Sequence, residues 1–136
     1  MTDPNRRQNL HLELERGDAS LRAADALLAL ALWDDAISRA YYAAFHWLRA
    51  LLFTEGLEAR THSGTHDLFF QHFVATGRAP RELAKRFAVL QKLREQADYA
   101  RAFRATEADA REQLAAAEQL RGWIDSALAS GGWLGP

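Results

Sequence analysis

The stretch AISRAYYAAFHWLRALL, residues 36–52, decides the fold of this chain. An α-helix has about 3.6 residues per turn, and this spacing places one set of side chains on an apolar stripe: Ile37, Tyr41, Ala44, Leu48 and Leu51. The opposite side carries a different set: Arg39, Tyr42, His46, Arg49 and Phe53. Because that side mixes aromatic rings with a fixed cation and an imidazole, we expect it to contact a second subunit, a ligand, or both.

Composition restricts the class of protein. The chain has 136 residues, of which 49% are hydrophobic and 26% charged, as in an ordinary soluble domain. No apolar run approaches the roughly 18 residues of a membrane span, and the N-terminal MTDPNRRQNLHLELER lacks the apolar core of a signal peptide. With no Cys, disulfides and thiolate metal sites are excluded. We therefore expect a cytoplasmic protein that has no membrane partner.

Caps and breakers predict a long first helix and the limits of the second. Asp3 is the predicted N-cap of the first helix, whose apolar spacing continues through Gly17 as far as Ala31. Asp34 is predicted to cap the helix that contains 36–52. Gly56 is a usual C-terminal stop and is predicted to end it.

The second half of the chain predicts three more helices. Ser63 is the predicted cap of a short third helix, which Gly77 ends. Pro80 opens a fourth helix. The segment 106–109, Thr-Glu-Ala-Asp, resembles a capping box at the start of a fifth helix, with Asp in place of the usual Glu or Gln. The Ser-Gly-Gly segment at 130–132 is predicted to end this last helix.

The predicted fold is all-α. No segment alternates with a period of two residues, and no Asn-Gly or Asp-Gly hairpin turn is present. The sequence therefore predicts an antiparallel bundle of four long helices plus one short helix. We expect one domain over residues 1–129 and a flexible C-terminal tail over residues 130–136.

Charge is distributed unevenly. The segment from Arg78 to Arg104 holds eight Lys or Arg residues and three acids, whereas the rest of the chain holds nine and fifteen. A basic stripe attracts phosphates, and on this interpretation Lys92 and Arg101 contact RNA. The alternative is an ordinary solvated helix face.

Arg94 departs from the apolar pattern of the fourth helix. It falls in line with Leu90 and Ala97, and Arg101 follows on the same line one helical repeat later. A guanidinium does not lose its charge, so a buried one needs an anion. Asp98, four residues later, can supply it. Either the two residues form a structural pair that joins two helices, or Asp98 holds Arg94 for binding a phosphate.

Arg39 and His46 are the candidate catalytic pair. They are seven residues apart, so two turns of helix stack them on one line. An imidazole is the usual general acid or base near pH 7, and a guanidinium can stabilise a pentacoordinate phosphate. Together they are sufficient for metal-free cleavage of RNA by the substrate's own 2′-hydroxyl. The alternative is that His46 is a packed interface residue.

His62 and His66 have the spacing of two metal ligands on a helix. The local sequence Thr61-His62-Ser63-Gly64 is typical of a loop, however, and no acidic residue is placed to act as a third ligand with the two histidines. We therefore expect loop and cap roles for both histidines and no metal site. No phosphate-binding glycine loop, dinucleotide fingerprint or nucleophile elbow is present, so no cofactor is expected.

Three motifs together resemble a known family. They are SRAYYAAFHWLRALL at 38–52, THSG at 61–64 and LREQADY at 93–99. In order and spacing they resemble the prokaryotic branch of the HEPN domains that is also called UPF0332, and the resemblance covers about residues 18–128. It implies a helical bundle that forms a homodimer with a cleft between the subunits.

The resemblance also implies functions. Many HEPN domains are metal-independent endoribonucleases whose composite site takes an Arg, four to six further residues and a His from both subunits. Arg39 and His46 match this pattern, with Tyr42 in a supporting position. Prokaryotic members often act as toxins, and a minimal nucleotidyltransferase serves as antitoxin and can modify a tyrosine, for which Tyr99 is the candidate. In many catalytic members the motif lies on a later helix, where this chain has Asp98 in place of the His.

Three functions are therefore open. The first is a ribonuclease toxin that the nucleotidyltransferase neutralises. The second is a non-catalytic module that binds a nucleotide or another substrate and works with that partner, and the third is a purely structural dimer. The alignment of Arg39 with His46 favours the first, and Asp98 favours the second.

Overall fold

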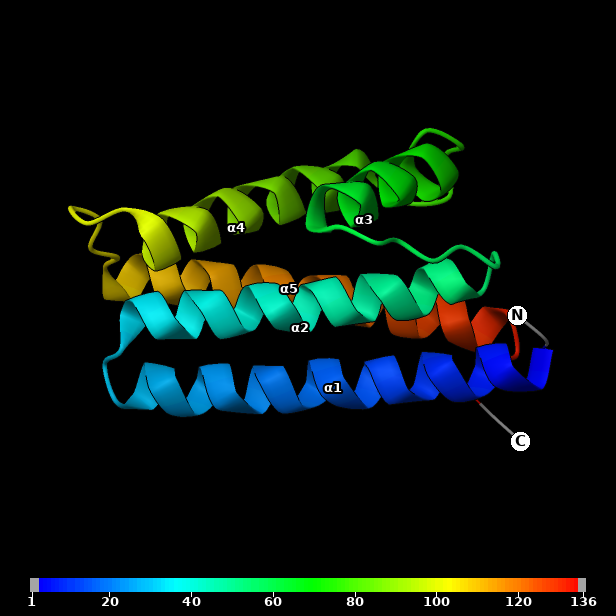
Figure 1. Ribbon diagram of the computed structural model, residues 1–136, viewed down its shortest axis with the longest axis horizontal. Helices are drawn as coiled ribbons and strands as arrows, with labels where there is room; N and C mark the ends of the chain where they lie inside the picture. Colours follow the sequence, from blue (N-terminus) through cyan, green and yellow to red (C-terminus); the bar gives the residue numbers. More distant parts are fainter. Residues whose placement is uncertain (1–2, 135–136) are drawn as a thin grey trace.

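The structure, a computed structural model, describes residues 3–134, and within them it is helical with no strand. The predicted all-α fold is confirmed (Figure 1). The elements in chain order are α1 (Asp3–Ala29), α2 (Trp33–Phe53), α3 (His62–Phe69), the π-helical turn η1 (Phe70–Val74), α4 (Arg81–Tyr99) and α5 (Glu107–Ser130). No helix of this described part is long and apolar enough to cross a membrane.

Helix α2 is the centre of the bundle. It packs against α1, α3, α4 and α5, and Figure 1 shows α1 and α4 on its opposite sides. The predicted apolar stripe is confirmed, because each of its members is at most 1% exposed: Ile37, Tyr41, Ala44, Leu48 and Leu51. Phe53 falls on the other side of α2, as predicted, but it belongs to the core. It is only 3% exposed, whereas Tyr42, His46 and Arg49 are partly exposed.

Helix α1 runs without interruption through Gly17, and Trp47 of α2 packs directly on that residue. A Cβ at Gly17 would lie 2.4 Å from Trp47 Cδ1 and Nε1, far inside van der Waals contact. The indole is fully buried, and its Nε1 donates a hydrogen bond of 2.9 Å to Asp18 Oδ1. Gly17 therefore serves close packing between α1 and α2.

Two predictions for the connection between α1 and α2 are wrong. Ala31 lies in the turn after α1, with a φ of 63°. Asp34 does not cap α2, because the N-cap residue is Leu32, which makes no side-chain capping bond. Instead, Asp34 Oδ1 accepts a 2.8 Å hydrogen bond from Ala105 N and ties the start of α2 to the segment before α5. Gly56 follows the end of α2 with a φ of 70°, as predicted for a stop.

The other element ends follow the predictions with two exceptions. Thr61, not Ser63, caps α3, since its side chain accepts a 2.9 Å hydrogen bond from Gly64 N. Helix α4 ends at Tyr99, so Arg101 lies in the following turn and not on the helix. The capping box over 106–109 is confirmed, with both reciprocal hydrogen bonds formed.

The start of α1 lies beside the segment that follows α5. Arg7 Nη1 of α1 donates 3.0 Å hydrogen bonds to the carbonyls of Gly132 and Trp133. The flexibility predicted for 130–136 stays a prediction, and its last two residues lie outside the described part. The capping role predicted for the Asp3 side chain also lies outside what the structure describes.

Candidate functional site

One side of α2 forms a half-buried row of aromatic and basic side chains. We call this row, with the histidine of α3 that packs on it, the α2 strip: Arg39, Tyr42, Phe45, His46, Arg49 and His62. His62 is the first residue of α3, and its ring centroid lies 4.4 Å from that of Phe45. Because they are only partly buried, these side chains are within reach of a ligand.

His46 is held by an acid from α1 that sequence reasoning missed. His46 Nδ1 lies 2.6 Å from Oε2 of Glu13, which is only 5% exposed. Arg49 and Arg16 lie 3.7 and 3.6 Å from the other carboxylate oxygen. Burial alone would raise the pKa of Glu13. The hydrogen bond to His46 and the charges of Arg49, His46 and Arg16 outweigh burial and lower that pKa below its ordinary value.

The Glu13 bond determines which nitrogen of His46 is available. Since Nδ1 faces the carboxylate, Nε2 is the nitrogen that a substrate can use. A carboxylate in this position also fixes the orientation of the ring. One feature of the sequence could have indicated that Glu13 is buried. It lies three residues after Leu10 and directly before Leu14, on the buried side of α1. An acid there requires a partner.

Aromatic contacts connect Arg39 to His46. The Arg39 guanidinium carbon lies 4.7 Å from the ring centroid of Tyr42. The Tyr42 ring lies 5.9 Å from that of His62, and Phe45 lies 4.4 Å from His62 and 5.5 Å from His46. The structure therefore places the two predicted catalytic residues on one row, although no ion pair or hydrogen bond joins them within the described residues.

Tyr41 connects the strip to α4. The Tyr41 side chain is fully buried, and its hydroxyl lies 2.8 Å from His62 Nδ1. The guanidinium carbon of Arg94 lies 4.7 Å from the centroid of the Tyr41 ring. Burial raises the pKa of Tyr41 to about 12, although the charge of Arg94 acts in the opposite direction. The phenol therefore stays protonated at any physiological pH.

Arg94 is buried in the structure, and Asp98 lies next to it. It is 6% exposed, and its Nη1 lies 3.8 Å from Asp98 Oδ2, which also accepts a 3.5 Å hydrogen bond from Ser38 Oγ. Both the burial of Arg94 and its proximity to Asp98, which the sequence predicted, are present. Tyr99, in contrast, is 75% exposed, and its ring centroid lies 5.9 Å from the Arg94 guanidinium carbon.

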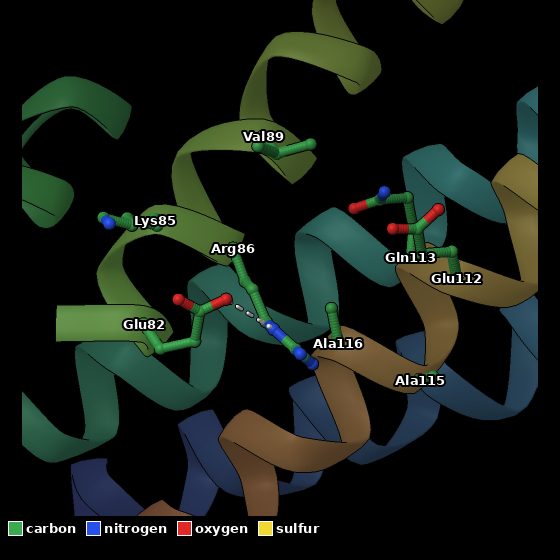
Figure 2. A pocket seen from close by; sticks show the side chains of 8 residues that line it. All are labelled: Glu82, Lys85, Arg86, Val89, Glu112, Gln113, Ala115 and Ala116. Atoms are coloured by element: carbon green, nitrogen blue, oxygen red, sulfur yellow. Dashed lines mark hydrogen bonds and ion pairs between the residues drawn. The ribbon is translucent and has the colours of Figure 1, made fainter. Parts of the chain in front are cut away.

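The basic segment shares its surface with acids. Arg86 forms a hydrogen bond with Glu82, and beside them residues of α4 and α5 line a groove of about 310 Å³ (Figure 2). Its walls carry Lys85 and Arg86 together with Glu82 and Glu112, so the cations are partly neutralised there. Lys92 and Arg101 are exposed. Phosphate binding by Lys92, Arg94 and Arg101 stays a prediction.

The prediction that His62 and His66 lie in a loop is wrong, because the cap of α3 is Thr61, two residues before Ser63, so that both histidines belong to the helix. His62 bonds to Tyr41, and the ring of His66 stacks on Phe87 with centroids 5.7 Å apart. Across residues 3–134, no group of three or more His, Asp or Glu side chains is arranged to hold a metal ion.

Comparisons with known proteins place this architecture in a family. The family model described as the HEPN domain matches residues 11–127. A UPF0332 protein of Gloeobacter violaceus is 42% identical over 86 residues, which are 63% of this chain and 68% of that protein. A Methanocaldococcus jannaschii protein that is provisionally named as a toxin is 34% identical over 93 residues, or 68% of this chain and 69% of that protein. The crystal structure of TT1696 from Thermus thermophilus is similar with a TM-score of 0.74 at 26% identity, covering 86% of this chain and 96% of that chain.

Proposed function

Because this chain belongs to the HEPN domain family and to its UPF0332-like branch, we propose that it is a cytoplasmic toxin that cleaves RNA without a metal ion. A homodimer cleft forms the composite site, and a minimal nucleotidyltransferase is the antitoxin. The observation that carries the proposal is the 2.6 Å contact between Glu13 and His46, which presents Nε2 of a half-buried imidazole on the α2 strip. The toxin name of the Methanocaldococcus jannaschii relative supports the biological role.

The proposed reaction needs only the substrate and protein side chains. The RNA 2′-oxygen attacks the neighbouring phosphorus, and a bond from O2′ to phosphorus forms as the bond to O5′ breaks. One imidazole removes the proton of the 2′-hydroxyl, and another gives a proton to the departing 5′-oxygen. In a dimer, the two copies of His46 can fill these two roles. Arg39 stabilises the extra negative charge of the phosphorane. The products are a 2′,3′-cyclic phosphate and a 5′-hydroxyl.

The proposal is tested with purified protein and end-labelled RNA in excess chelator. We expect cleavage to persist in chelator and to stop when every 2′-hydroxyl is methylated, because the 2′-oxygen is the nucleophile. Analysis of the product ends should find the cyclic phosphate. If the protein leaves unmodified RNA intact, or cuts it only when a metal ion is added, the nuclease proposal is wrong.

The dimer is a separate prediction. The α2 strip carries large rings that remain half-exposed in one chain, and a two-fold contact would bury it against its own copy. Light scattering at micromolar concentration should give twice the chain mass of 15.3 kDa. A mass of one chain would contradict a composite site. The interface should exceed the roughly 1,000 Å² of a specific contact.

A non-catalytic module that binds a nucleotide and works with the nucleotidyltransferase is the second candidate. It is favoured by α4, where Asp98 takes the position of the catalytic His and the neighbouring Tyr99 exposes 75% of its surface to a modifying enzyme. RNA that stays intact in the cleavage assay, together with transfer of adenylate to Tyr99 by the partner, would favour this function over the nuclease.

A further inference from the structure

His62 reaches the α2 strip from another helix. It packs on Phe45 and Tyr42, two members of the row that leads from Arg39 to His46. The sequence predicted only a loop or cap role for it. The Phe45 ring contacts both imidazoles, with its centroid 4.4 Å from that of His62 and 5.5 Å from that of His46, so a ligand that covers Phe45 can reach both.

The bond between Tyr41 and His62 determines where the His62 proton lies. The Tyr41 hydroxyl is fully buried, and a buried O–H group without an acceptor is costly. The Arg94 guanidinium beside the phenol oxygen can only donate, so the acceptor for the Tyr41 O–H is His62 Nδ1, 2.8 Å away. A neutral imidazole that accepts at Nδ1 carries its proton on Nε2. Burial, followed by the charges of Arg94 and His46, lowers the pKa of His62, which favours the neutral ring.

The second nitrogen of His62 is free to bind a ligand. Two histidines lie on α3, and His66 Nε2 is buried without a partner, whereas His62 Nε2 is not among the buried, unpaired atoms of the described residues. The only hydrogen bond of the His62 ring within those residues is the one at Nδ1. An N–H donor on a fixed ring beside an aromatic side chain is suited to a phosphate oxygen next to a stacked base.

We propose that His62 is a second substrate-binding imidazole, which donates its Nε2–H to a phosphate oxygen of bound RNA while His46 acts on the scissile bond. Tyr41 is a positioning residue, because its hydroxyl fixes the tautomer and ring angle of His62. Arg94 is a positioning residue one step further away, because its guanidinium lies over the Tyr41 ring. This inference rests on the proposed function and names a residue of the same site.

The first experiment measures the tautomer of His62 without any ligand. Long-range proton–nitrogen NMR spectra of the wild type should show His62 with its proton on Nε2. In Tyr41→Phe, the His62 nitrogen shifts should move toward a mixture of tautomers, while those of His72, on η1, stay unchanged. A wild-type His62 that carries its proton on Nδ1 would overturn the inference.

The second experiment measures binding of a labelled 2′-O-methyl RNA, which the proposed chemistry cannot cut. Loss of a hydrogen bond to a charged group should make binding by His62→Ala about 10- to 100-fold weaker. His62→Gln should recover most of the affinity, since its amide N–H can replace Nε2–H, and a matched His72→Ala variant should bind like the wild type. Circular dichroism melts identify any variant that is not folded.

The outcomes separate the two proposals. If the wild type binds the RNA and His62→Ala binds it equally well, the role of His62 is wrong and the proposed function stands. If the wild type neither binds nor cleaves RNA, the proposed function is wrong and the phosphate contact of His62 fails with it. Loss of binding in both His62→Ala and His62→Gln, with both variants folded, would overturn the role of Nε2–H as a simple donor.

Discussion

His46→Asn should cleave RNA about 10²–10⁴-fold more slowly than the wild type and should melt at nearly the same temperature. The reason lies in the two nitrogens of His46. The Asn amide N–H can donate to Glu13 as Nδ1–H does, so the buried carboxylate keeps its partner. Asn has no counterpart of Nε2 that gains and loses a proton, so only the acid–base function is removed. Single-turnover cleavage rates and thermal melts measure both effects.

His46→Ala and His72→Asn complete the experiment. His46→Ala should be as slow as His46→Asn but less stable, because it removes the hydrogen-bond partner of the buried Glu13 carboxylate. His72→Asn makes the same substitution on η1, away from the α2 strip, and should cleave at the wild-type rate. Cleavage by His46→Asn at the wild-type rate would show that His46 is not the general acid or base.

The fold was predictable because its determinants are local. The apolar stripe of α2, the capping box at 106–109 and the stop at Gly56 each depend on residues within one or two helical turns. Asp34 shows the limit of local reasoning. An Asp before a helix favours a cap, but the backbone N–H of Ala105, 71 residues later, takes its carboxylate.

The candidate site was predictable only in part, because its chemistry depends on contacts between helices. Periodicity places Arg39 and His46 on one line but cannot show that Glu13 of α1 holds the imidazole. His62 was missed for a smaller reason. The choice of Ser63 as cap in place of Thr61 left His62 in a predicted loop, whereas the structure begins α3 with it. An error of two residues in the predicted start of α3 therefore kept His62 out of the predicted site.

The sequence predicted the burial and the pairing of Arg94 but not its contact with Tyr41. Its position on an apolar line indicated burial and a pairing with Asp98, and both are present. The same burial places the guanidinium over Tyr41 rather than at the surface. Direct phosphate binding by Arg94 would require this packing to open. If a substitution of Arg94 weakens RNA binding, we therefore expect the effect to pass through Tyr41 and His62.

Glu13→Gln should lower the free energy of unfolding at pH 7 by about 1.5–3 kcal/mol, the contribution of hydrogen bonds to charged groups. The amide keeps the shape of the side chain but removes the charge that faces His46, Arg49 and Arg16. Because folding lowers the pKa of Glu13 below its ordinary 4.5, the unfolded chain binds more protons in that range. The contribution of Glu13 is thus complete above pH 4.5 and is lost as the pH falls through the folded pKa.

The difference in stability between the wild type and Glu13→Gln should therefore shrink as the pH falls below about 4.5, since the wild-type carboxylate then becomes protonated. Urea denaturation at a series of pH values measures it. Glu15→Gln is the matched control, because Glu15 lies on the same helix but is exposed, and this variant should stay close to the wild type at every pH. A stability difference for Glu13→Gln that stays constant from pH 7 to pH 3 would mean that the Glu13 charge does not stabilise the site. The orientation of His46 by that charge would then have no energetic basis.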